Sequence, residues 1–249
     1  MHSRNYELSA TLYDALHAGE VQRLAKSLVP RLFGCDVPEG TTVLDLGCGT
    51  GTLLVELERY GLRGIGIDLS SEMVDIARRK HPTLDFIVSD MCSLDLERKF
   101  DLVLCTNDAM NYLLPERRSV FFETVARHMN PNSMCYIDFD TETDFTKFWD
   151  GQRSETAGDG WHLTRIYAYD SDMRIGTELQ EWRVDTANGP QTFTESHILR
   201  PLSPDEIAAF AQDAGLSVDH FIEPVELLRV DEALSGYLRL GCVIRCRQA

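Results

Sequence analysis

Long apolar runs, an excess of basic residues and a regular cysteine pattern are all missing from this sequence. Its 249 residues contain no stretch of about 18 apolar residues, the length that a membrane-spanning helix needs. The N-terminal segment also lacks the apolar core of a secretory signal. The seven cysteines are scattered and include no Cys-x-x-Cys pair. Because this pattern is typical of reduced thiols, we expect a cytoplasmic protein without a membrane contact.

Basic charge is scarce as well. The chain has 24 Lys and Arg against 40 Asp and Glu, which gives a formal net charge of −16. So acidic a chain is a poor ligand for a phosphate backbone, and we expect no nucleic-acid partner. No His-Glu-x-x-His segment and no cluster of cysteine and histidine is present, so we expect no metal ion.

Three glycines at alternate positions form the most informative stretch of the chain. The apolar segment Val43–Leu46 reads as a buried parallel strand, and Gly47, Gly49 and Gly51 follow it directly. Glycine suits a turn that needs positive φ or that approaches a ligand closely. A helix is expected from Thr52, and its N-terminus would present free N–H groups. We therefore predict a nucleotide-type site at the carboxyl end of this strand.

The details of the turn disfavour a dinucleotide. The dinucleotide fingerprint G-x-G-x-x-G needs a third glycine where this chain has Thr52. Asp45 precedes Gly47 by two residues, where a carboxylate suits an ammonium and a sulfonium better than a pyrophosphate. The chain also lacks the Tyr-x-x-x-Lys pair of many oxidoreductases, so an NAD-binding oxidoreductase is the least favoured hypothesis.

The stretch 44–51 resembles the first motif of the class I S-adenosylmethionine (SAM) methyltransferases, and the resemblance extends over residues 40–140 and 201–249. It implies SAM as cofactor and S-adenosylhomocysteine as product. Asp68 directly follows the expected strand 64–67. At this position a carboxylate can accept hydrogen bonds from ribose hydroxyls. The resemblance implies that Asp90 accepts from the adenine amino group and that Met91 lies near the ring. The full set of expected cofactor-binding residues is Asp45, Gly47, Cys48, Gly49, Gly51, Asp68, Leu69, Met73, Asp90, Met91, Thr106 and Asn107.

The expected fold is of the α/β class. It is a doubly wound, Rossmann-like, mostly parallel seven-stranded sheet with an N-terminal helical lid and a small inserted antiparallel sheet. Core strands are expected at 43–46, 64–67, 84–88, 100–105, 134–139, 216–222 and 240–246. Helices are expected within 5–33, where Gly19 divides two of them, and over 71–80, 115–127 and 204–214. A turn is expected at 130–133.

The segment 140–200 breaks the α/β pattern. Alternating residues over 161–169, 178–185 and 193–199 predict three antiparallel strands. We therefore expect a single methyltransferase domain, 1–249. It has a lid over 1–40, a SAM-binding core over 41–139 and 201–249, and an insert that contributes to the substrate site. The insert is also a candidate homodimer interface.

The methyl acceptor is expected beside the polar loop after the fourth strand, which faces the ligand crevice of a doubly wound sheet. Asp108, Tyr112, His197 and Tyr13 are the candidate catalytic residues, and His162 is a further candidate base. The candidate substrate-binding residues are Asn111, Tyr112, Arg165 and His197, and Arg165 with Arg200 could bind an anion.

A narrower resemblance covers nearly the whole chain. Leu12-Tyr13-Asp14 with His17, the segment 202–206, and Glu195-Ser196-His197 are similar to stretches of the amino-sugar N-methyltransferases and related natural-product enzymes. Where such an enzyme shows His in the loop after strand four, this chain has Tyr112, which puts a sugar substrate in doubt. The favoured hypothesis is methyl transfer to a small-molecule amine. The alternatives are O- or C-methylation of a small molecule or a tRNA nucleotide, and a non-catalytic SAM sensor.

Overall fold

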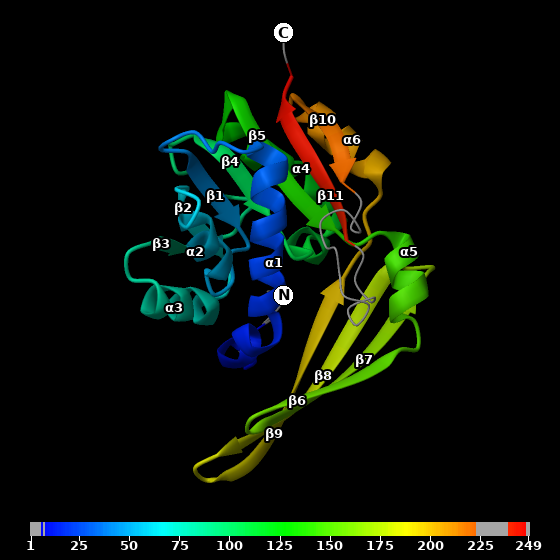
Figure 1. Ribbon diagram of the computed structural model, residues 1–249. Coiled ribbons are helices and arrows are strands. Elements are labelled where there is room, and N and C mark those ends of the chain that lie inside the picture. The colour runs from blue at the N-terminus through cyan, green and yellow to red at the C-terminus, as the bar shows by residue number, and fades with distance from the viewer. Residues whose placement is uncertain (1–5, 7, 223–238, 248–249) are drawn as a thin grey trace.

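A seven-stranded sheet forms the centre of the protein, and a second sheet of four strands projects from it (Figure 1). The computed structural model describes Tyr6, residues 8–222 and residues 239–247. The large sheet has the order β10-β11-β5-β4-β1-β2-β3, with β11 antiparallel to both of its neighbours. Its strands are β1 (Thr42–Leu46), β2 (Arg63–Asp68), β3 (Asp85–Val88), β4 (Phe100–Cys105), β5 (Met129–Phe139), β10 (Leu216–Ile222) and β11 (Leu240–Cys246). The expected doubly wound, mostly parallel architecture is confirmed.

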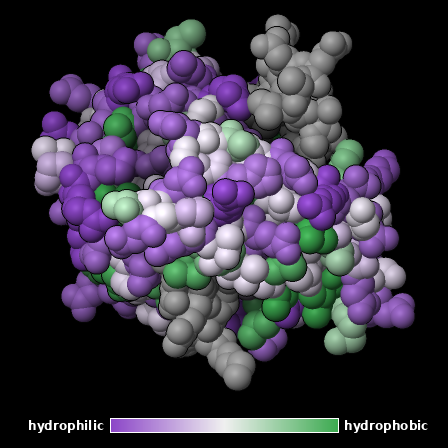
Figure 2. Space-filling view, turned by 90° about the horizontal axis from the view of Figure 1, so that it is seen from below, coloured by the Kyte–Doolittle hydropathy of each residue, from purple (hydrophilic) through white to green (hydrophobic). Residues whose placement is uncertain are grey.

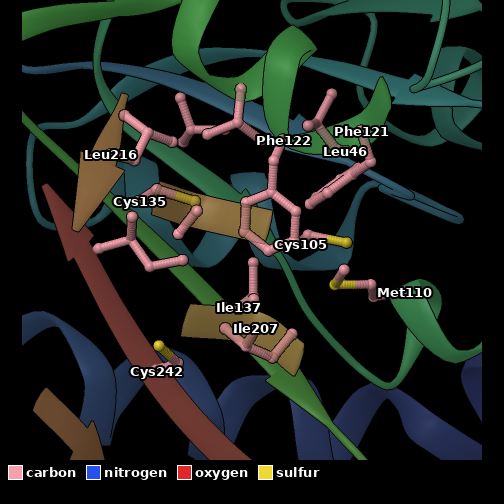
Figure 3. Close-up of a cluster of buried hydrophobic side chains, with 14 of the residues drawn as sticks. Leu46, Cys105, Met110, Phe121, Phe122, Cys135, Ile137, Ile207, Leu216 and Cys242 are labelled. Carbon is pink, nitrogen blue, oxygen red and sulfur yellow. The ribbon is translucent and has the colours of Figure 1, made fainter. Parts of the chain in front are cut away.

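Helices cover both faces of the large sheet. The helical segments of the described residues are η1 (Ala10–Leu12), α1 (Tyr13–Phe33), α2 (Thr52–Glu58), α3 (Ser71–Lys80), η2 (Ala109–Tyr112), α4 (Pro115–Arg127), α5 (Glu142–Asp144), the π-helical turn η3 (Phe145–Trp149) and α6 (Pro204–Asp213). On one face α1, α2 and α3 bury leucine, valine and alanine side chains against the strands. On the other face α4 and α6 pack Phe121, Phe122 and Ile207 onto Cys105 and Ile137 (Figure 3). Since each fully buried large side chain contributes about 1.5–3 kcal/mol, these two layers hold the strand ends in place.

Local capping chemistry fixes the helix starts as the sequence predicts. The Ser203 hydroxyl accepts a hydrogen bond from Glu206 N at 3.1 Å, and Ser203 N donates to the Glu206 carboxylate at 2.8 Å. This is a capping box, and Pro204 occupies the first helical position. Ser70 caps α3 by accepting from Met73 N at 3.2 Å.

Two predictions about element boundaries are wrong. Gly19 does not divide two helices, because α1 runs unbroken through it and even through Pro30. Burial of Val21 and Leu28 on the face shared with α2 outweighs the cost of about 1 kcal/mol for a helical glycine. The expected turn at 130–133 lies within β5, whose pairing with β4 continues across a register shift.

The inserted sheet has four strands where the sequence predicts three. They are β6 (Arg153–Gly158), β7 (Trp161–Asp170), β8 (Ile175–Thr186) and β9 (Gly189–Leu199), in that order. Every residue of β6 is exposed, so this edge strand has no apolar alternation by which sequence reasoning could find it. The short helical segments α5 and η3 were not expected either.

The face seen from below is largely hydrophilic, with hydrophobic residues gathered toward one edge (Figure 2). No helix within the described ranges is long and apolar enough to span a bilayer.

Candidate active site

The glycine turn closes tightly after β1. Gly47, Gly49 and Gly51 have φ values of +80°, +54° and +79°, in the left-handed region. A Cβ on Gly47 would lie 2.8 Å from the Ala109 Cβ, and one on Gly51 would lie 2.5 Å from the Phe86 ring. The nearest atom to a Cβ on Gly49 would be in the Tyr13 ring, at 3.8 Å. Two of the glycines are therefore required by packing, whereas Gly49 faces the space beneath the N-terminal helix.

Asp68 at the end of β2 fastens this turn. Its Oδ2 accepts a hydrogen bond from Gly49 N at 2.8 Å, and its Oδ1 accepts from Ser70 N at 2.9 Å. Burial raises the pKa of Asp68, and these backbone donors oppose that effect. Each carboxylate oxygen has a second lone pair, so Asp68 can still accept hydrogen bonds from a diol.

Asp45 is the least satisfied polar group near the turn. Its side chain is buried, and among the described residues neither carboxyl oxygen has a hydrogen-bond partner. Burial raises its pKa to about 7, and the charge of Asp68 adds to the effect. Buried polar groups are ordinarily paired, so an unpaired carboxyl beside a glycine turn fits a cationic ligand group such as the α-ammonium of SAM.

The expected adenine contacts already have partners within the protein. Asp90 accepts from Arg117 Nη2 at 2.7 Å and from Cys92 N at 2.9 Å. Met91 packs against the main hydrophobic core, and Met73 is buried. Of the other expected cofactor residues, Cys48 and Thr106 are buried, whereas Leu69 is exposed.

The start of α1 lies over the turn, as a lid would. The Asp14 carboxylate accepts hydrogen bonds from Thr50 Oγ1 at 2.5 Å and from Thr52 Oγ1 at 3.1 Å, and it pairs with Lys80. From the sequence, Asp14 is recognised only as part of a motif, and its contacts with the glycine turn and Lys80 are not predicted. Its direct neighbour Tyr13 is held by the same contacts above Gly49.

The loop after β4 is strained and crowded with charge. Asn107 and Asp108 have φ values of 55° and 53°, which non-glycine residues adopt rarely. Arg239, directly before β11, donates to Asn107 Oδ1 at 3.2 Å, pairs with Asp108 at 3.0 Å and lies 3.7 Å from Asp140. Burial raises the pKa of Asp108, Arg239 opposes the shift, and the charges of Asp140 and Asp138 add to it. Sequence reasoning missed Arg239, although a single basic residue next to an apolar strand is a readable signal.

Asn111, an expected substrate-binding residue, hydrogen-bonds to the backbone. Its side chain is fully buried, and Nδ2 donates to Asp140 O and Arg200 O, both at 2.9 Å. Its Oδ1 accepts from Asp140 N at 3.0 Å. Both the Nδ2 and the Oδ1 of the side-chain amide are therefore hydrogen-bonded to backbone groups. Through these bonds Asn111 joins the two ends of the insert to the loop after β4.

Tyr112, His197 and Tyr6 meet between the core and the insert. The Tyr112 hydroxyl lies 3.1 Å from His197 Nδ1 and 2.9 Å from the Tyr6 hydroxyl. Tyr6 in turn packs edge-on against Tyr13, with ring centroids 5.5 Å apart. Burial lowers the pKa of His197 to about 4, and nearby Arg165 adds to the shift, so its imidazole is neutral near pH 7.

The insert brings its own charged residues to this place. Arg165 pairs with Glu178 at 3.1 Å, so its charge is already balanced. Glu195 is buried next to His197, whose Nε2 lies 4.0 Å from its Oε2. His162, the further candidate base, lies away from Tyr112 and His197. It is half-exposed near the distal β6–β7 hairpin beside Glu155, about 17 Å along β7 from the level of His197. Within the described part of the chain, no group of three or more His, Cys, Asp or Glu is arranged to hold a metal ion.

The sheet order and the glycine turn with its two acidic residues are those expected of a class I SAM-dependent methyltransferase. A methyltransferase-domain family model matches residues 43–132. The chain is 28% identical over 219 residues to dTDP-4-amino-2,3,4,6-tetradeoxy-D-glucose N,N-dimethyltransferase from Saccharopolyspora spinosa, covering 85% of this chain and 86% of the relative. It is 25% identical over 231 residues to dTDP-3-amino-3,4,6-trideoxy-alpha-D-glucopyranose N,N-dimethyltransferase from Streptomyces venezuelae, covering 86% and 93%.

The fold has a solved counterpart with the cofactor in place. The SAM-bound amino pentose methyltransferase from Micromonospora echinaspora superposes with a TM-score of 0.74 at 22% identity, covering 93% of this chain and 96% of that one. The present chain is a SAM-dependent methyltransferase, and the expected enzyme class and cofactor are confirmed.

Proposed function

We propose that this enzyme transfers the methyl group of SAM to the nitrogen of a small-molecule amine. The observation that carries the proposal is a continuous row of contacts from the turn to the insert. Gly49 lies under Tyr13, Tyr13 contacts Tyr6, and Tyr6 meets the Tyr112–His197 pair. An acceptor along this row would lie next to the methyl donor and be shielded from water by the lid. The names of the two relatives, both amine N,N-dimethyltransferases, support nitrogen as the methylated atom.

The SAM side of the site is proposed as follows. Asp45 would face the methionyl ammonium, the glycine turn would follow the methionyl chain, and Asp68 would bind the ribose. Asp90 and Met91 would contact the adenine, with Met73 and Leu69 beside it. Thr106 and Asn107 would complete the site near the sulfonium. Bound SAM would supply an activated methyl group on a good leaving group, so alignment is the main demand on the protein.

The acceptor side must handle one proton. An ammonium has no lone pair, so its proton has to leave before the N–C bond forms and the C–S bond breaks. Asp108 is the proposed acceptor for this proton, because burial raises its pKa and so makes it a stronger base than an ordinary carboxylate. Tyr112 and the neutral His197 would orient the amine. A hydroxyl acceptor would need a stronger base than any of these, so O-methylation is less favoured.

The test is a turnover screen of amines, amino sugars and phenols with detection of S-adenosylhomocysteine. Methylation of amines, and none of phenols, is the expected result. Gly49→Val should abolish turnover by filling the space beneath Tyr13, and the exposed Glu181→Gln should not change it. Turnover of phenols alone would show that the acceptor atom is oxygen. SAM binding without any turnover would favour a sensor.

We also propose the functional division of the chain into a lid over 1–40, a core over 41–139 and 201–249, and a substrate-binding insert over 140–200. Two copies would pair through the insert, whose edge strand β6 is exposed along its length. Light scattering would test this, and the mass of a single chain would refute it. The seven free thiols support a cytoplasmic location, which cell fractionation would test.

A further inference from the structure

One face of the inserted sheet is turned toward Tyr112. We call the polar residues of this face, Arg165, Glu178, Gln180, Glu195 and His197, the insert wall. Cross-strand pairing places Arg165 opposite Gln180 and Gln180 opposite Glu195, and places Glu178 opposite His197. Residues two apart on a strand share a face, so all five members of the insert wall point the same way. Because His197 contacts Tyr112, this face of the inserted sheet is turned toward the loop after β4.

Glu195 is the unsatisfied member of the insert wall. Its side chain is 5% exposed, and among the described residues neither carboxylate oxygen accepts a hydrogen bond. Gln180 lies directly opposite, but its amide donates to Glu178 and accepts from the Trp182 indole. His197 is near but neutral, so it does not balance a carboxylate. A buried carboxylate without a partner is costly, which indicates that a ligand completes it.

Other carboxyl groups lie near the insert wall, so the charged groups around Glu195 are mainly acidic, as Glu195 itself is. Four carboxyl groups interact near the loop after β4, those of Asp108, Asp138, Asp140 and Glu178. Glu195 lies beside His197, which pairs across the strands with Glu178. The guanidinium groups of Arg165 and Arg239 lie near these residues, and both already pair with carboxylates. The rings of Tyr6, Tyr13 and Tyr112 lie between the turn and the insert wall, and aromatic faces attract cations as well.

We infer that the acceptor binds as a cation and carries no phosphate, and that Glu195 is the insert residue that pairs with it. This rests on the proposed N-methylation and narrows its substrate class. The relatives act, by their names, on amino sugars joined to dTDP, which carries a diphosphate. In this chain a diphosphate at the insert wall would meet a surplus of carboxylates and guanidinium groups that are already paired. A free or glycosidic amine would meet complementary charge.

A matched set of probes tests the inference. The set comprises one amino sugar as its methyl glycoside, the same amino sugar as its dTDP ester, and the glycoside with hydroxyl in place of the amine. Binding is measured by calorimetry with S-adenosylhomocysteine bound, so that no turnover occurs. We expect the amine glycoside to bind at least tenfold more tightly than the dTDP ester, and the hydroxyl glycoside to bind more weakly than the amine.

Two variants test whether Glu195 is the residue that pairs with the cationic amine. Glu195→Gln should weaken binding of the amine glycoside about tenfold, the effect of losing roughly 1.4 kcal/mol, and leave the hydroxyl glycoside unaffected. Glu181→Gln, on the same sheet but in an exposed position, is the matched control and should change neither. Unchanged affinity for S-adenosylhomocysteine would show that each variant is folded.

The two hypotheses fail in different ways. Tighter binding of the dTDP ester, or failure of both amines to bind, overturns the charge inference. If the dTDP ester is methylated on nitrogen and the glycoside is not, N-methylation stands and the inference is wrong. If hydroxyl compounds alone are methylated, the proposed function itself is wrong.

Discussion

Replacing Asn111 with alanine tests whether this residue supports the fold or touches the acceptor. Its buried amide makes three hydrogen bonds to backbone groups, two to the carbonyls of Asp140 and Arg200 and one to the N–H of Asp140. Asn111→Ala would remove all of them. The Asp140 N–H would then be left without a partner where the insert leaves the core. The two carbonyl oxygens would each keep one other donor, Leu202 N at 3.1 Å for Asp140 O and Arg118 Nη2 at 3.3 Å for Arg200 O.

The expected cost is large. A buried polar group left unsatisfied costs about 1–3 kcal/mol and an ordinary lost hydrogen bond about 0.5–1.5 kcal/mol, so one of the first and two of the second cost about 2–6 kcal/mol. A domain of ordinary stability has about 5–15 kcal/mol in total, so the variant should be close to unfolding at moderate urea concentrations.

Urea unfolding followed by tryptophan fluorescence measures this effect, since Trp149 and Trp182 are buried beside or within the insert. Asn132→Ala, an exposed asparagine in β5, is the control and should change stability by less than about 0.5 kcal/mol. Wild-type stability of Asn111→Ala, together with a raised KM for the acceptor, would refute the structural role and restore the role expected from the sequence.

Four further predictions concern the cofactor site and the buried histidine. Asp68→Ala should weaken SAM binding by about 1–3 kcal/mol in calorimetry, and equal affinity would exclude the ribose assignment. Gly51→Ala should destabilise the fold by about 1–3 kcal/mol, because its Cβ would lie 2.5 Å from the Phe86 ring at φ +79°; an unchanged Tm would contradict this. Asp14→Ala should speed SAM dissociation in stopped-flow measurements, and an unchanged rate would mean that the lid contacts do not retain SAM. Burial lowers the pKa of His197 from 6.5 to about 4. Between pH 6.5 and pH 4 this imidazole is therefore protonated in the unfolded chain and neutral in the folded chain. The wild type should therefore lose stability as pH falls from 6.5 to 4, by roughly 3 kcal/mol from this group, and His197→Gln should lose less. Identical pH profiles of the two proteins would show that His197 is not buried neutral.

Local chemistry explains which elements could be predicted. The capping box at Ser203 and the cap at Ser70 act within a few residues of the helix start, so their sequence patterns are sufficient. The same holds for the turn at Gly47–Gly51, whose strand, glycines and helix are contiguous. By contrast, the unbroken α1 depends on α2 packing against it, and Gly19 by itself gives the wrong indication. Among the described strands, β6 pairs with β7, and this pairing leaves no apolar pattern in the sequence of β6.

The residues proposed to bind the methyl donor can be predicted from the sequence, whereas those proposed to bind the acceptor meet only in the folded protein. The proposed donor site lies mainly at the ends of successive parallel strands, so a fixed spacing along the chain places Asp45 and Asp68 at one edge of the sheet. The acceptor side joins Tyr6, Tyr112, His197 and Arg239, which come from distant segments and meet only when the insert and lid pack onto the core. Their chemistry also depends on burial, because desolvation and neighbouring charge shift the pKa values that decide which groups are neutral and which hold a proton.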